Sequence, residues 1–303
     1  MDECFGGIEA GGTKFVCAVG SGPDDLYKKS FVTTNPEETL DCAAAFFKEQ
    51  NSKRPISAIG IGSFGPIDLH KGSSTYGFIT STPKAGWANT DIVGRIKALL
   101  DVPVGFDTDV NAAALGEHYW GAGKGLHSFI YLTVGTGIGG GGLINGKLLH
   151  GLVHPEMGHI CIPQHIEDTY FGRCPYHNKN SLYNCFEGLA SGPAVEERWG
   201  QSPQSLSDDH KAWDLEAYYI SMALVSYICT LSPQRIIIGG GVMRQERLIV
   251  LIRDKVKKLL NNYIQSGEIT DSIQDYIVLP KQGDNAGVLG AFELAKLELA
   301  LPH

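Results

Sequence analysis

Two glycine-rich turns are the residues of this chain whose type and spacing point most directly to chemistry. Residues 133–142 (TVGTGIGGGG) and residues 11–14 (GGTK) each lie between two runs that read as strands. Backbone without side chains can approach a ligand closely and direct several N–H groups at it. Either segment alone is better explained as a tight turn. Together they predict two phosphate-facing loops, and therefore an ATP-driven phosphoryl transfer.

A pair of carboxylates, Asp107 and Asp109, follows a predicted strand and precedes a predicted helix. A carboxylate at a helix N-terminus stays ionised because the helix dipole favours negative charge there, so it can accept a proton from a substrate hydroxyl. Asp109 could equally serve only as the N-cap of that helix. The residues alone leave both interpretations open.

Side chains that could bind a metal gather in a polar, turn-rich segment, residues 155–192. Cys174 and His177 have the spacing of a ligand pair, and His159 and Cys185 flank them. Four nitrogen and sulfur ligands are typical of a closed tetrahedral site, so we expect a structural zinc ion. Two alternatives remain: Cys161 could take one of the four places, or the cysteines could be buried without a metal.

The elements that must position these residues alternate between strand and helix, which favours mixed sheets covered by helices. Asn35 and Pro36 have the residue types of an N-cap and a first helical position, and they predict a helix to about Gln50. A strand, a glycine turn and a second strand occur in each half, which indicates internal repetition with a boundary near residues 117–123. Further helices are expected near residues 91–100, 109–121, 215–231, 244–261 and 284–299, and strands near 6–10, 14–20, 56–65, 103–106, 235–241 and 276–280.

Composition excludes several classes of function. The chain has 303 residues, 43% of them hydrophobic, which is enough for two lobes with a core each. The net charge of −8 argues against nucleic acid or an anionic membrane as a partner, because both attract basic surfaces. No apolar run approaches the roughly 20 residues that span a bilayer. Seven thinly spread cysteines and an acidic N-terminus without a secretory signal predict a cytoplasmic protein.

Six segments, residues 5–20, 59–68, 103–117, 130–160, 185–194 and 236–243, together resemble the ROK family of bacterial sugar kinases and sugar-responsive repressors. The resemblance follows the family's order over nearly the whole chain. It implies an α/β, two-lobed, duplicated ribonuclease H-like fold of the actin and hexokinase type. We expect one lobe from residues 1–118, completed by a C-terminal helix at 286–303, and a second lobe from residues 119–285.

The resemblance also implies the roles of the motif residues. Asp109, within the string DTDVNAA, matches the family's catalytic base. Glu9, where many members carry Asp, is expected either to organise Mg²⁺ or to hydrogen-bond the neighbouring turn. The residues expected to contact ATP are Gly11, Gly12, Thr13, Lys14, Thr133, Gly135, Thr136, Gly137, Gly139, Gly239, Gly240 and Gly241. Those expected to contact the sugar are Gly65, Thr108, Asp109, Glu156, His159 and Glu187.

In the metal segment the chain departs from the family's usual pattern. His177 stands where the family usually has a cysteine, and a longer insert (KNSLYN) precedes Cys185. Zinc could therefore be held more weakly by His159, Cys174, His177 and Cys185 than in other members. His159 would both bind zinc and face the sugar.

The strings GIEAGGTKF, SFGPID, STPKAGW and DTDVNAA resemble the fructokinase branch of the family. This resemblance implies phosphorylation of D-fructose to fructose 6-phosphate by a homodimer, with mannose or glucose as the alternative substrate. Trp87 is expected either to lie near the sugar or, as the slightly favoured alternative, to pack inside its lobe.

A sugar-sensing regulator is disfavoured, because its helix-turn-helix segment has no counterpart before the first strand. An ATPase scaffold without a sugar is disfavoured by the glutamates beside the metal segment.

Overall fold

Two five-stranded sheets organise the chain, of which the computed structural model describes residues 3–178 and 183–301. The first sheet belongs to unit 1, which comprises the residues up to Gly125, Leu148–Pro155 and those from Lys281 on. Unit 2 comprises Leu126–Lys147 and Glu156–Pro280. The segment Leu148–Pro155 therefore belongs with the first part of the chain, whereas the sequence-based division placed it in the second.

The sheet of unit 1 has the strand order β3-β2-β1-β4-β7, in which the first three strands are antiparallel and the last two run parallel to β1. Its strands are β1 Phe5–Ala10, β2 Lys14–Gly22, β3 Asp25–Val32, β4 Ala58–Ser63 and β7 Val104–Thr108. The remaining strands of this unit, β5 Phe78–Ile79 and β6 Thr90–Asp91, pair with each other. The turn between β1 and β2 holds the first glycine-rich segment, as the sequence predicts.

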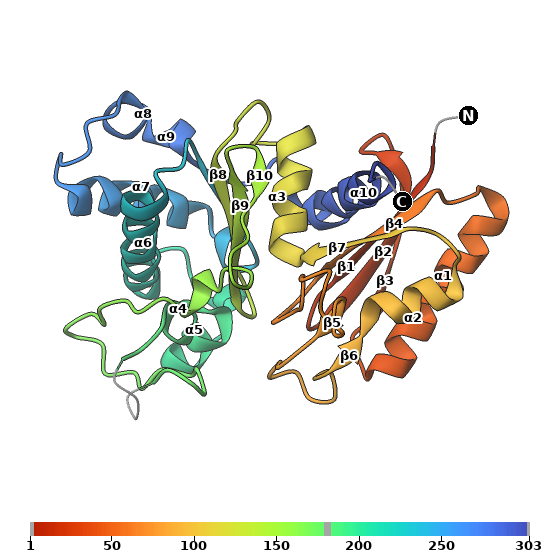
Figure 1. Ribbon diagram of the computed structural model, residues 1–303. Coiled ribbons are helices and arrows are strands. Elements are labelled where there is room, and N and C mark those ends of the chain that lie inside the picture. Colours follow the sequence, from red (N-terminus) through yellow and green to blue (C-terminus); the bar gives the residue numbers. More distant parts are fainter. Residues whose placement is uncertain (1–2, 179–182, 302–303) are drawn as a thin grey trace. The chain divides into compact units, whose positions relative to one another are not determined.

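Helices cover both faces of this sheet (Figure 1). They are α1 Pro36–Lys53 and α2 Ile92–Leu99 on one face, and α3 Asp109–Trp120 and α10 Ala286–Leu299 on the other. Helix α1 begins as predicted, because the side-chain oxygen of Asn35 accepts a hydrogen bond from the Glu38 amide at 2.9 Å. Ile8 and Phe47 lie in the core on the α1 side, and Phe5 and Phe292 in the core on the α10 side.

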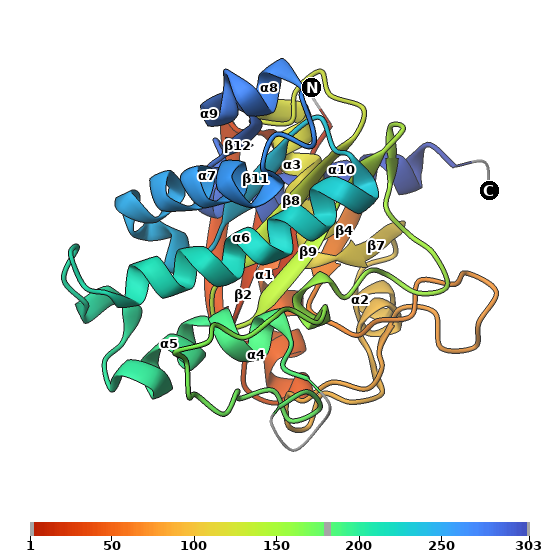
Figure 2. The same cartoon turned by 90° about the vertical axis from the view of Figure 1, so that its left-hand side faces the viewer.

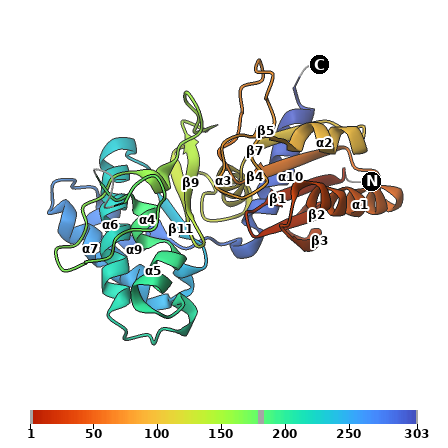
Figure 3. The ribbon, with the colours of Figure 1, turned by 90° about the horizontal axis from the view of Figure 1, so that it is seen from below.

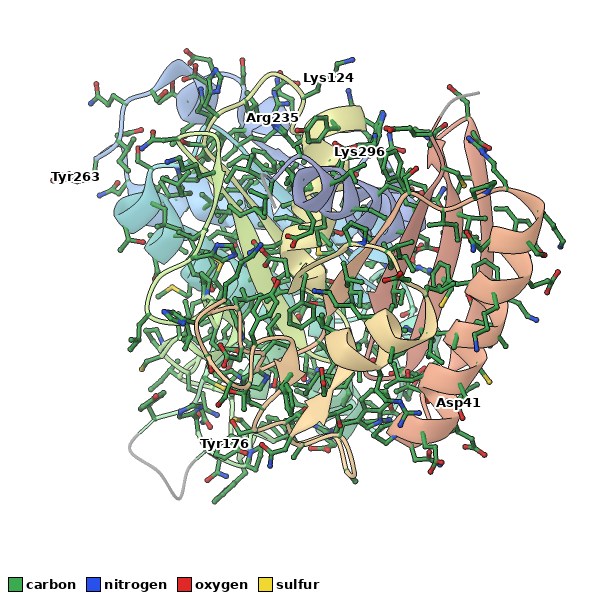
Figure 4. All side chains as sticks on the ribbon, turned by 45° about the vertical axis from the view of Figure 1, so that its right-hand side comes forward. Asp41, Lys124, Tyr176, Arg235, Tyr263 and Lys296 are labelled. Atoms are coloured by element: carbon green, nitrogen blue, oxygen red, sulfur yellow. The ribbon has the colours of Figure 1, made fainter. Side chains whose placement is uncertain are left out.

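Helix α10 packs directly against backbone. A Cβ atom at Gly60 in β4 would lie 1.7 Å from the carbonyl oxygen of Ala291, and one at Gly290 would lie 1.5 Å from that of Ala112 in α3. Only glycine permits such close approach. Near the end of α10 is Lys296, which is labelled in Figure 4. Its ammonium group lies over the rings of Phe5 and Trp120, at 5.3 and 5.2 Å from the ring centroids.

Unit 2 repeats the design. Its sheet has the order β10-β9-β8-β11-β12. As with β1 in unit 1, the strand β8 pairs antiparallel with the next strand along the chain, β9, and parallel with a later strand, β11, to which β12 is also parallel. Its strands are β8 Phe129–Val134, β9 Ile138–Ile144, β10 Lys147–Leu148, β11 Ile236–Gly239 and β12 Ile277–Val278. The matching order confirms the internal repetition that the sequence indicates.

Two long helices, α6 Ala212–Leu231 and α7 Glu246–Leu260, lie side by side across one face of this sheet (Figure 2). The short helices α4 Phe186–Ala190 and α5 Gly192–Trp199 follow each other, and α4 contacts α6 (Figure 3). The remaining helical turns are α8 Gly267–Thr270, α9 Ile273–Tyr276, η1 Met157–His159, η2 Pro203–Ser205 and η3 Val242–Arg244, with η4 Gly283–Asn285 in unit 1.

Two expectations about unit 2 need correction. The second glycine-rich segment is mostly strand: Gly139 to Gly142 lie in β9, and only residues 135–137 form the turn. The run YIVLP forms only the two-residue strand β12, because Tyr276 ends helix α9. Over residues 3–178 and 183–301, no helix is long and apolar enough to cross a membrane.

Candidate functional site

The N-terminus of α3 carries the candidate catalytic carboxylate. Thr108, the last residue of β7, caps the helix, because its hydroxyl accepts a hydrogen bond from the Asn111 amide at 3.1 Å. Asp109 is the first helical residue, and its half-buried carboxylate accepts a hydrogen bond from the Val110 amide of the first turn at 2.9 Å. The interpretation of Asp109 as the N-cap is therefore wrong. Thr108, predicted to contact the sugar, is 5% exposed and takes the capping role.

A buried carboxylate, that of Asp107, anchors this helix start to a distant segment. Asp107 is 2% exposed, and one of its oxygens accepts hydrogen bonds from the Thr108 amide at 2.7 Å and the Asn111 side chain at 2.8 Å. The other oxygen lies 2.7 Å from Nε2 of His150. This hydrogen bond raises the pKa of His150 above its ordinary value. No motif marks His150 in the sequence, and 43 residues separate it from Asp107.

The His150–Asp107 pair predicts a pH-dependent stability. Because the folded state raises the pKa of His150, it binds the proton more tightly than the unfolded state. The contribution of the pair is complete below the ordinary pKa of about 6.5 and is lost as the pH rises through the raised value. The His150 side chain is 42% exposed, so the contribution should stay below about 1 kcal/mol.

Urea unfolding of the wild type and His150→Gln between pH 5 and pH 9 measures this contribution. The difference between the two free energies of unfolding should shrink with rising pH. A difference that stays constant over this range contradicts the prediction.

Glu9, at the end of β1, lies close to Asp109 in unit 1. Burial and the negative charge of Asp109 raise the pKa of Glu9 to about 7, although Lys14 partly offsets this. The N-terminus of α10 approaches the same carboxylate, since a Cβ atom at Gly287 would lie 2.6 Å from it. A carboxylate that is held beside another negative charge has the character of a cation ligand.

The first glycine-rich turn is held by its neighbours. The Gly11 amide donates to the Lys14 carbonyl at 3.0 Å, and the hydroxyl of Thr33 donates to the Gly11 carbonyl at 2.7 Å. Nothing lies within 4 Å of the Cβ position at Gly12, so the tip of the turn is open. In the described part of the chain the hydrogen bonds to this turn come from Thr33 and not from Glu9. Thr13 and Lys14 complete the turn and are exposed.

The second glycine-rich turn borders a polar recess in unit 2. Gly135 and Thr136 line it together with residues after β11 and around the start of α5, and its volume is about 280 Å³. The backbone of Gly240 has a φ of 96°, a conformation that glycine adopts readily. The recess is lined by Gly135, Thr136, Gly192, Pro193, Glu196, Pro203, Gln204, Gly241 and Val242. Glu196 and Gln204 were missed from the sequence, because no motif marks them.

The other predicted ATP contacts of unit 2 surround this turn. Thr133 in β8 pairs with Gly139 in β9, and Gly137 ends the turn between these strands. Gly239 ends β11, next to Gly240. Two separate parts of the sequence are thus brought to one place within unit 2.

Four predicted metal ligands come together in unit 2: His159, Cys174, His177 and Cys185, whose ligand atoms all lie within 4.8 Å of one another. The sulfur of Cys174 lies 3.8 Å from Nδ1 of His159 and 3.6 Å from Nδ1 of His177. A tetrahedral zinc ion with normal bond lengths separates sulfur from nitrogen by about 3.6 Å. The donor set therefore fits zinc. Residues 179–182 of the predicted insert lie outside the described residues.

Glu187 connects this cluster to the glycine-rich turn. Its Oε2 accepts a hydrogen bond from the Ile138 amide at 2.8 Å, directly after the turn. Its Oε1 lies 3.9 Å from Nε2 of His159, whose Nδ1 faces the sulfurs. This separation is longer than a hydrogen bond, so Glu187 is a neighbour of the imidazole and not its hydrogen-bond acceptor. Glu187 is the second residue of helix α4, whose N-cap is Cys185.

The remaining residues that the sequence analysis singled out are described by their packing and exposure. Gly65 packs beside His154, which accepts a hydrogen bond from the Ile67 amide at 3.0 Å. Glu156 is exposed and precedes η1, the turn that carries His159. Trp87 is fully buried against Phe15, so the interpretation as a packing aromatic holds.

Comparisons with known proteins agree with this geometry. The model of the ROK family matches residues 5–298. A Bacillus subtilis protein named putative fructokinase is 52% identical, over 96% of this chain and 95% of its own. The fructokinase of Lactococcus lactis is 45% identical, over 97% and 98%. The glucokinase of Halalkalibacterium halodurans is 26% identical, over 97% and 96%. The ROK hexokinase structure from Thermus thermophilus superposes with a TM-score of 0.78 at 27% identity, over 98% of this chain and 99% of that one.

Proposed function

Because the chain belongs to the ROK family, we propose that it is an ATP-dependent hexose kinase that converts D-fructose to fructose 6-phosphate. The observation that carries the substrate is the identity of 52% and 45% with proteins named as fructokinases, over nearly their full lengths. The glucokinase relative is much less similar, at 26%. The duplicated, helix-covered sheets are those of the ribonuclease H-like fold that hexokinases use.

Asp109 is the proposed general base. Its carboxylate accepts the proton of the sugar 6-hydroxyl while that oxygen forms a bond to the γ-phosphorus of ATP. The bond from the γ-phosphorus to the bridging oxygen breaks, and ADP leaves. The position of Asp109 at the start of α3 supports this role, because the helix dipole keeps the carboxylate ionised.

The nucleotide is assigned to three turns and the recess. The Gly11 and Gly135 amides bond within their own turns, so the backbone N–H groups that suit phosphate oxygens are those of Gly12, Thr13, Thr136 and Gly137. The glycines at 239–241 suit the adenosine side. In the recess, the carboxylate of Glu196 can accept hydrogen bonds from ribose hydroxyls. Mg²⁺, when bound, neutralises phosphate charge, and Glu9 would hold the ion or its waters.

The sugar is assigned to Glu156, His159 and Glu187, together with Gly65 and Thr108. Carboxylates suit sugar recognition because each can accept paired hydrogen bonds from neighbouring hydroxyls.

A structural zinc ion is proposed for the cluster of His159, Cys174, His177 and Cys185. It would fix the orientation of His159, which lies beside Glu187. We further propose a cytoplasmic homodimer, which light scattering on the purified protein tests.

An assay of ADP release with fructose, mannose, glucose and N-acetylglucosamine tests the substrate. Fructose is expected to give the highest kcat/KM, and mannose and glucose about tenfold lower values, since one neutral hydrogen bond distinguishes such sugars weakly. A higher kcat/KM for glucose or mannose supports the alternative, a broader manno- or glucokinase. ADP release that no sugar stimulates overturns the proposal.

Replacement of Glu9 by Gln tests its role toward Mg²⁺. The amide keeps the size of the side chain but loses its charge, so the Mg²⁺ concentration for half-maximal rate should rise by about tenfold or more. Titration of activity with Mg²⁺ at saturating ATP measures it. Glu3→Gln is the matched control, because Glu3 is exposed and precedes the same strand. Unchanged Mg²⁺ dependence in Glu9→Gln assigns Glu9 a purely structural role.

A further inference from the structure

Cys161 faces a metal-cluster cysteine across a short pair of extended segments. An isolated antiparallel bridge pairs Cys161 with Cys185. The hydrogen bonds flank the pair: the Phe186 amide donates to the Ile160 carbonyl at 3.0 Å, and the Ile162 amide to the Asn184 carbonyl at 3.5 Å. Cys161 and Cys185 therefore form a non-hydrogen-bonded pair, the closer of the two kinds in an antiparallel ladder.

This register suits a disulfide. Residues of a non-hydrogen-bonded pair have Cα atoms roughly 4.5 Å apart, with side chains on the same face. Disulfides span Cα separations of about 4.4–6.8 Å. Both thiols are free in the structure. Cys185 is fully buried with the metal ligands, whereas Cys161 is exposed and does not belong to the four-residue cluster.

We propose that Cys161 is an oxidation site that forms a cross-strand disulfide with Cys185 when the cluster holds no metal. The oxidant is a hydroperoxide such as hydrogen peroxide. The Cys161 thiol is first oxidised to a sulfenic acid, with release of one water molecule. The Cys185 sulfur then forms the S–S bond and the sulfenic oxygen leaves as a second water, so that two thiols and one peroxide give one disulfide and two waters.

The disulfide would take a ligand from the cluster. Cys185 contributes one of its four ligand atoms, and its sulfur also accepts a hydrogen bond from the Gly188 amide at 3.3 Å, which caps α4. Helix α4 carries Glu187, whose carboxylate binds the Ile138 amide beside the glycine-rich turn. Oxidation therefore blocks metal uptake and disturbs the helix that supports this turn. This consequence rests on the proposed metal site, whereas the disulfide itself does not.

The test uses the full-length protein stripped of metal with a chelator. After treatment with hydrogen peroxide, free thiols are alkylated and the digest is examined by mass spectrometry without reduction. A peptide pair joined through Cys161 and Cys185 is expected in the wild type and absent in Cys161→Ser. Cys229→Ser is the matched control, because Cys229 is also exposed in unit 2, and it should give the same cross-link as the wild type. Zinc-loaded protein should give at most one-tenth of the cross-link.

Zinc uptake gives a second readout that needs no kinase activity. The peroxide-treated wild type should bind less than one-tenth of the zinc of the untreated protein, and dithiothreitol should restore uptake. The circular dichroism of Cys161→Ser checks that this exposed substitution leaves the fold intact. A cross-link between Cys174 and Cys185 in the wild type, or Cys161 recovered only as sulfinic or sulfonic acid, overturns the proposal. Loss of kinase activity in every sample would contradict the proposed function and leave this result standing.

Discussion

Asp109→Asn is expected to lower kcat by two to four orders of magnitude while fructose still binds. The amide of Asn has the size of the carboxylate and can hydrogen-bond a sugar hydroxyl, but it cannot accept the proton of the 6-hydroxyl. General-base catalysis typically contributes 10²- to 10⁴-fold, which sets the expected loss. The rate of ADP release gives kcat, and calorimetry with fructose gives the dissociation constant, which should change less than tenfold.

Asp101→Asn is the matched control for this variant. Asp101 is an exposed carboxylate of the same unit, just before β7, so its substitution makes the same change of charge. Its kcat should equal that of the wild type. A kcat for Asp109→Asn within a few fold of the wild type would remove Asp109 as the base.

Cys174→Ser is expected to remove the bound zinc and to destabilise unit 2. The cysteine is 2% exposed, and its sulfur lies 3.6–3.8 Å from the imidazole nitrogens of His159 and His177. At a free zinc concentration 1,000 times the dissociation constant, binding stabilises the folded state by about 4 kcal/mol. The variant should lose stability of this order. Elemental analysis gives the zinc content, and urea unfolding in the presence of zinc gives the free energy.

A chelator distinguishes loss of the metal from a packing defect. It should lower the stability of the wild type toward that of Cys174→Ser and should leave the variant unchanged. Cys229→Ser serves as the control, because this exposed cysteine lies outside the cluster, and it should retain the full zinc content. A chelator that destabilises Cys174→Ser as much as the wild type contradicts the assignment.

Features of the fold that depend on residues close together in the sequence, such as helix starts, were predicted well. Asn35 caps α1 because its side chain reaches an amide three residues later, and residue types alone are sufficient to predict this. The start of α3 was predicted correctly, but the alternative in which Asp109 caps this helix is wrong, because Thr108 is the N-cap. Either residue type can cap a helix, and the choice depends on the exact end of β7. In the second glycine-rich segment, strand pairing extends through Gly139 to Gly142, although glycine seldom favours strands.

The contacts that the sequence could not predict join residues distant along the chain. His150 meets Asp107 across 43 residues, and Glu187 meets the Ile138 amide across 49. No periodicity encodes such pairs, because they depend on how the elements pack. The metal ligands were predictable, since histidine and cysteine are uncommon and gather in one segment. The Cys161–Cys185 register was not, because it follows from two flanking backbone hydrogen bonds.

The direct packing of α10 on β4 affects the order in which the two units can complete their cores. Helix α10 comprises residues 286–299 of 303, yet its residues Val288 and Phe292 complete a core of unit 1. Every residue of unit 2 precedes Lys281. All of unit 2 is therefore synthesised before α10, so unit 1 cannot complete its core ahead of the synthesis of unit 2, although its strands come first. Until α10 is added, the side of β1 and β4 that it covers lacks the apolar contacts of Val288 and Phe292.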